Sequence, residues 1–97
     1  MEPKRAIEQE RNYIENLTQE IAKIEGFGLL NSMTQLERLR KLECEGVLNN
    51  NIKKSFHMVR ILESKAAFSD IRGQIEAALS INRNIYTITS WFVKYIS

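Results

Sequence analysis

The chain has 97 residues, a length that suits one domain and excludes two. Its 43% hydrophobic and 27% charged residues are typical of a globular protein. The net charge of +2 is unevenly spread, because residues 1–48 hold seven basic and nine acidic side chains and residues 49–97 hold seven basic and three acidic ones. The mildly basic second half is compatible with an anionic partner, although a solvated surface explains it more simply.

Cys44 is the only cysteine, so an internal disulfide is excluded and a reducing compartment is expected. The first residues lead into charge rather than into an apolar stretch, which gives no sign of a secretory signal. No apolar run approaches the roughly 18 residues that a membrane span needs. We therefore expect a cytoplasmic protein without a membrane span.

The first predicted helix covers residues 4–25. Its apolar side chains keep the a and d spacing of a heptad repeat, with Glu10 in one d position; they are Ile7, Ile14, Leu17, Ile21 and Ile24. Such a narrow seam is suited to packing against one other helix, either in the same chain or in a partner. Pro3 is tolerated ahead of this helix or in its first turn, and Gly26-Phe-Gly28 ends it.

The second predicted helix covers residues 32–45 and follows the short connector Leu29-Leu30-Asn31. Ser32 and Gln35 form an S-x-x-Q pattern, which is typical of a capping box at a helix start. The apolar stripe of this helix is formed by Leu36, Leu39 and Leu42. Gly46 is expected just past its end, because glycine enters the left-handed conformation without strain.

Two further helices are predicted, over residues 50–67 and 69–95. The first has an N-cap among Asn49, Asn50 and Asn51, and its apolar face consists of Ile52, Phe56, Val59, Leu62 and Ala66. The second is predicted to place Ile71, Ile75, Ala78, Leu79 and Ile85 on one face. Its last ten or so residues are rich in β-branched and aromatic side chains, so an irregular segment or a strand is the alternative there. We favour a helix, because the chain offers no second convincing strand.

The fold class that follows is all-α, a compact four-helix bundle in a single domain over residues 1–97. Short connections between consecutive helices predict antiparallel neighbours. The expected core consists of Ile14, Leu17, Ile21, Leu36, Leu39, Leu42, Phe56, Val59, Leu62, Ile71, Ile75 and Leu79.

Catalytic chemistry is not expected. The chain has one histidine, His57, and one cysteine, Cys44, on different predicted helices, and a zinc site would need three or four such ligands. The glycine pattern Gly26-Phe-Gly28 lacks the rest of a phosphate-binding loop. We therefore predict no catalytic residues, no metal ligands, no cofactor and no small-molecule substrate.

Residues Asn31–Leu48 resemble the end of a winged helix-turn-helix domain, in which a capped recognition helix ends in a leucine-rich turn followed by Gly and a short apolar strand. Phe56–Ile61 would then be the returning wing strand. In that family two short helices precede the recognition helix, whereas in this chain one long predicted helix precedes it. The resemblance implies a DNA-binding regulator built on residues 31–61. Its groove and phosphate contacts would be Gln35, Arg38, Arg40 and Lys41.

Arg72, Arg83 and Lys94 are each 11 residues apart, which is close to three helical turns. On one helix they would lie within about 40° of one another, roughly 16 Å apart along the axis. Such a line could follow a phosphate backbone, with Arg72 and Arg83 as nucleic-acid contacts. Long side chains covering the edge of an apolar face are the simpler explanation.

The strongest sequence signal for function is the aromatic group near the C-terminus, which consists of Tyr86, Trp91, Phe92 and Tyr95. On a helix these side chains cover more than one face, so packing inside the chain would leave some of them exposed. Aromatic residues are enriched at interface hot spots. We expect a non-catalytic module that binds another protein or itself, such as an adaptor, a chaperone or a virus-type modulator. The alternative is the DNA-binding regulator.

Overall fold

The structure is a computed structural model that describes residues 2–27 and 32–97. In these residues the chain forms four helices and no strand: α1 (Pro3–Ile24), α2 (Gln35–Cys44), α3 (Asn50–Ala67) and α4 (Ile71–Tyr95). The predicted all-α class and four-helix bundle are confirmed. The predicted roles of Gly28 and of the connector Leu29–Asn31 lie outside the described residues. The alternative of a strand at the C-terminus is wrong, because α4 continues to Tyr95.

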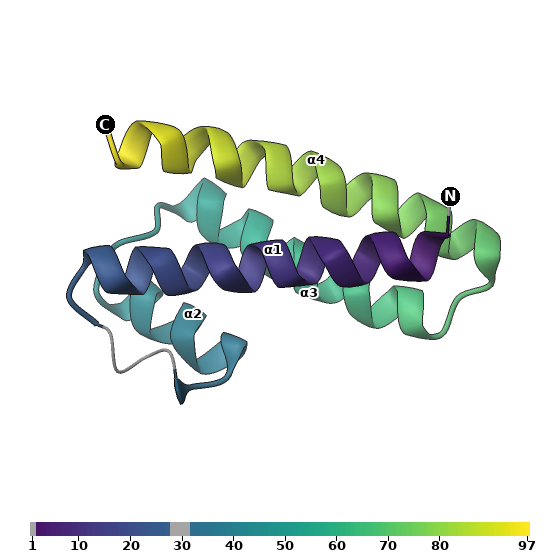
Figure 1. The fold of residues 1–97 in the computed structure, drawn as a ribbon, viewed down its shortest axis with the longest axis horizontal. Coiled ribbons are helices and arrows are strands. Elements are labelled where there is room, and N and C mark those ends of the chain that lie inside the picture. The colour runs from purple at the N-terminus through teal and green to yellow at the C-terminus, as the bar shows by residue number, and fades with distance from the viewer. Residues whose placement is uncertain (1, 28–31) are drawn as a thin grey trace.

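Three long helices lie along the 40 Å axis of the molecule, and the short α2 packs against one end of α1 (Figure 1). The antiparallel pair α3 and α4 has the most extensive contact, and α1 lies against α4. The hydrogen bond between the Tyr13 and Thr89 hydroxyls and the one from Tyr95 to Glu25 show that α1 and α4 run in the same direction. They do so because α3 is the only long helix between them in the chain and runs antiparallel to both, while the short α2 packs at one end.

The helix boundaries follow the expected local chemistry. Gly26 and Gly46 have φ angles of 82° and 72°, so both end a helix in the left-handed region that glycine enters without strain. The Asn49 side chain accepts a hydrogen bond of 2.9 Å from the backbone N–H of Ile52, which confirms an asparagine N-cap for α3. Asp70 caps α4 in the same way.

The predicted start of α2 is wrong by a few residues. Thr34, and not Ser32, is the N-cap: its hydroxyl accepts from the backbone N–H of Glu37, and the Glu37 carboxylate accepts from the N–H of Thr34. This T-x-x-E capping box lies two residues after the S-x-x-Q pattern. It leaves Gln35 free to make contacts outside its own helix end.

The core lies between α1, α3 and α4, with α2 closing one end. Of the predicted core, Ile14, Leu17, Ile21, Leu39, Leu42, Phe56 and Val59 are buried, and Leu36 and Leu62 are half-buried. The a/d seam of α1 therefore packs mainly inside this chain. Its remaining apolar positions are the half-buried Ile7 and the exposed Ile24.

The predicted apolar face of α4 is wrong for Ile71, Ile75 and Leu79, which are exposed. Ala78 is buried and Ile85 is half-buried against the core, as predicted. The residues that α4 buries are Gln74, Ala77, Ala78, Ile81 and Ile88. The helix therefore carries apolar side chains on two faces, and the one with the two alanines and two isoleucines packs inside the bundle.

Two phenylalanines, one in the middle of α3 and one just after its end, test this core. Phe56 is fully buried and Phe68 is 93% exposed. We expect Phe56→Ala to lower the free energy of unfolding by about 3–5 kcal/mol, since it removes a large buried ring and leaves a cavity. Phe68→Ala, the matched control, should change it by less than about 0.5 kcal/mol. Urea unfolding followed by circular dichroism measures both, and equal losses would contradict this assignment of the core.

Candidate protein-binding surface

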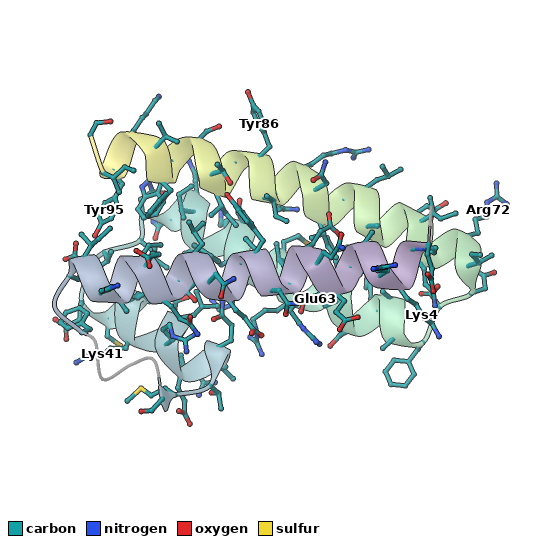
Figure 2. All side chains as sticks on the ribbon, in the orientation of Figure 1. Lys4, Lys41, Glu63, Arg72, Tyr86 and Tyr95 are labelled. Carbon is teal, nitrogen blue, oxygen red and sulfur yellow. The ribbon has the colours of Figure 1, made fainter. Side chains whose placement is uncertain are left out.

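The four predicted aromatic residues all lie on α4 and differ in burial: one is exposed and three are half-buried. Trp91 and Tyr95 stack with ring centroids 5.0 Å apart, and Phe92 packs beside Tyr95. All three lie against the core. Tyr86 is 76% exposed and points away from the bundle (Figure 2). Of the four predicted partner-binding residues, Tyr86 alone is freely accessible.

Tyr95 ties the C-terminus to α1. Its side chain lies between the end of α4 and α1 (Figure 2), and its hydroxyl donates a hydrogen bond to the Glu25 carboxylate, just after the end of α1. Partial burial and the neighbouring carboxylate raise the pKa of Tyr95 to about 12. The side chain therefore acts as a neutral hydrogen-bond donor that holds α4 against α1.

Tyr86 belongs to an exposed apolar stripe on α4. We define the α4 stripe as Ile75, Leu79, Tyr86 and Val93, which are between 37% and 76% exposed. At 100° per residue, these four side chains fall within about 40° of one another. Leu79, Tyr86 and Val93 are spaced by seven residues, which is the heptad spacing of a helix that packs against another helix.

A groove of about 430 Å³ runs beside the α4 stripe, between α1 and α4. Its lining consists of Ala6, Gln9, Glu10 and Tyr13 from α1, and Ala78, Leu79, Asn82 and Ile85 from α4. Leu79 therefore belongs both to the groove and to the stripe. Sequence reasoning did not assign this groove, because it is formed by two helices that are distant in the chain.

Glu10 is the acidic group in this groove. Its Oε1 atom is buried without a hydrogen-bond partner. Burial, and then the negative charge of Glu63 on α3, raise the pKa of Glu10 to about 7. The burial of this carboxylate could have been predicted from the sequence, because Glu10 occupies a d position in the apolar seam.

The predicted nucleic-acid contacts Gln35 and Arg38 are used inside the protein. Arg38 is only 3% exposed, and its guanidinium donates to Gln35 Oε1 at 2.7 Å and to the Met33 carbonyl at 3.0 Å. The Thr18 hydroxyl also lies 2.7 Å from Gln35 Oε1. This polar cluster attaches α2 to α1, and it removes Arg38 from any surface that could bind phosphate.

The other four predicted contacts are exposed and do not form one site. Arg40 and Lys41 lie on α2, and Lys41 is paired with Glu45 at 2.8 Å. Arg72 and Arg83 lie on α4, next to the α4 stripe. Figure 2 shows Lys41 and Arg72 at opposite ends of the molecule.

The winged helix-turn-helix architecture is not formed. Phe56–Ile61, the expected wing strand, lies inside α3. The apolar positions of residues 52–66 repeat with a helical period, so this segment buries one helical stripe instead of one face of a strand. The resemblance reflected a capped, leucine-rich helix followed by glycine, a pattern that this bundle shares with that family.

His57 and Cys44 do not form a reactive pair. His57 Nε2 lies 2.6 Å from a Glu43 carboxylate oxygen, so its partner is an acidic group on α2, while Cys44 is exposed. Within residues 2–27 and 32–97, no group of three or more His, Cys, Asp or Glu side chains could hold a metal ion.

The raised pKa of Glu10 predicts a pH dependence of stability. Since its folded pKa of about 7 exceeds the ordinary 4.5, the folded state binds more protons between these values and the free energy of unfolding falls as pH rises through them. Glu10→Gln should reduce this decline, which urea unfolding at several pH values measures. Glu20→Gln, at an exposed position on α1, should leave it unchanged. An unaltered decline in Glu10→Gln would contradict the prediction.

Comparisons with known proteins add no family assignment. No family model matches the chain, and neither curated proteins nor solved structures give a match. None of the helices in the described part of the chain is long and apolar enough to cross a membrane.

Proposed function

We propose that this chain is a non-catalytic protein-binding module that contacts another protein, or a second copy of itself, through the outer face of α4. The α4 stripe is the observation that carries the proposal. Exposed apolar side chains on a single protein are usually scattered over its surface, and four of them aligned on one side of a helix indicate an interaction site. Tyr86 lies within this row, and exposed tyrosines are frequent anchors at interfaces.

The mode of action that fits this surface is helix-against-helix binding. The stripe continues for more than two heptads of a regular helix, so a partner helix could lie along it with side chains interlocked. Binding of this kind alters the partner's activity or assembly without any chemical step. We propose a cytoplasmic location, which the single, exposed cysteine supports because a free thiol persists in a reducing compartment.

Nucleic-acid binding is the second candidate, and the exposed arginines of α4 favour it. Arg72 and Arg83 lie on the solvent side of this helix, in line with Lys94. Three separated charges give only weak binding, which falls steeply as salt rises.

Affinity capture with tagged protein separates the candidates. Tagged bait is mixed with a lysate of the source cells that contains an untagged copy of the chain, with and without nuclease, and the retained proteins are identified by mass spectrometry. We expect stoichiometric retention that survives nuclease and is lost in Tyr86→Asp, because a charge placed in an apolar contact cannot be desolvated cheaply. Ile61→Asp, at a half-exposed position on α3, is the matched control and should retain the same proteins.

Loss of all retained proteins on nuclease treatment would favour the nucleic-acid candidate. Equal capture by wild type and Tyr86→Asp would contradict binding through α4. Circular dichroism and thermal unfolding of each variant show whether the fold is intact.

A further inference from the structure

We infer that the outer face of α4 is a self-association surface, on which a second copy of this chain binds with its α4 antiparallel. This inference rests on the proposed function and names the occupant of the α4 stripe. Three observations carry it: the heptad register of the exposed face, the placement of its charges, and the size of the surface.

The register comes from the exposed side chains of α4. Leu79, Tyr86 and Val93 occupy one seam position of a heptad. The other seam position is occupied by the exposed Ile75 and Asn82, and then by Thr89, which is half-buried and hydrogen-bonded to Tyr13 of α1. Two copies related by a two-fold axis near residues 80 and 81 would place Ile75 opposite Tyr86 and Leu79 opposite Asn82. All of the central seam residues would then find partners on the same surface of the other copy, as an isologous interface requires.

The charges beside the stripe select the antiparallel direction. Glu76 and Arg83 are exposed, lie seven residues apart on the same flank, and form no ion pair in the described part of the chain. In the antiparallel arrangement, Glu76 lies beside Arg83 of the partner subunit, within about 3 Å along the axis, and the two-fold axis repeats this pair. In a parallel arrangement the α4 positions on the side facing this flank are Ile71, Ala78 and Ile85; Ala78 is buried, Ile85 is half-buried beside α1, and none of the three carries a charge.

Asn82 has a defined place in this arrangement. It is exposed at the edge of the groove between α1 and α4, next to Leu79. The proposed axis passes close to this residue, so the grooves of the two copies would lie near each other and each would be flanked by Leu79 of the partner subunit.

The surface reaches the size of a small dimer interface. With the axis between residues 80 and 81, residues 71–90 of α4 face the same residues of the partner subunit, an overlap of about 30 Å. The adjoining edge of α1 widens the face to roughly 20 Å. This area of roughly 600 Å² lies at the lower end of the ~600–1,000 Å² per partner of a standard interface.

Sedimentation equilibrium of the purified full-length chain over a concentration series tests the association. We expect a species of twice the 11.3 kDa monomer mass at high concentration. Glu76→Arg and Arg83→Glu should each weaken association by about tenfold, because each places like charges together at two symmetric sites. The double variant restores both pairs with reversed sign and should associate as the wild type does. Tyr86→Asp should weaken association at least 100-fold, and the control Ile61→Asp should leave it unchanged.

A distance between spin labels tests the direction. In a Cys44→Ser, Lys94→Cys variant, the antiparallel dimer places the two labels about 40 Å apart along the axis, whereas a parallel dimer brings them within roughly 20 Å. A monomer at all concentrations, a short distance, or no recovery in the double charge variant would overturn the inference. If the chain stays monomeric while affinity capture retains a different protein in a Tyr86-dependent way, the inference fails and the proposed function stands.

Discussion

The burial of one apolar core between α1, α3 and α4 is the interaction on which the rest of this structure depends. A chain of this size buries roughly 60–68% of its unfolded surface and here has no disulfide to support it. Phe56 at the centre of α3 contributes the largest fully buried side chain, with Ile21, Ile81 and Ile88 around it. Each helix can direct only one side toward this core. Apolar residues on its other sides therefore stay exposed to solvent or pack against another molecule.

The polar cluster at α2 shows how the fourth helix joins that core. α2 is short, and its leucines Leu39 and Leu42 cover the end of the bundle. The Arg38 guanidinium is nevertheless taken out of water, which is tolerable because Gln35, Met33 and Thr18 supply acceptors for its N–H groups. Hydrogen bonding and apolar packing therefore act together in holding α2 in place, and the same bonds remove the most buried cation from the protein surface.

The functional proposals both come from the surplus of apolar residues on α4. α1 and α3 cover the face that carries Ala77, Ala78, Ile81 and Ile88, and the α4 stripe remains outside. Glu76 and Arg83 flank this stripe with opposite charges, so the surface is self-complementary under a two-fold axis as well as apolar. Glu10, in the neighbouring groove, shows that this side of the molecule already holds a carboxylate at a cost in desolvation.

The sequence by itself determined the class of fold and almost all of the local structure. Helical periodicity, an asparagine cap at residues 49–51, and the glycines Gly26 and Gly46 depend on neighbouring residues, so they were visible without a tertiary structure. Only the tertiary structure decided which face of α4 is buried and which residues meet across helices. Periodicity alone could not rank two apolar faces of one helix, because the choice rests on the close approach that small residues allow. Arg38 was predicted to be a surface cation for a related reason. The groups that accept its hydrogen bonds include Thr18 on α1 and the Met33 carbonyl before α2, and helical periodicity does not show which residues meet across helices.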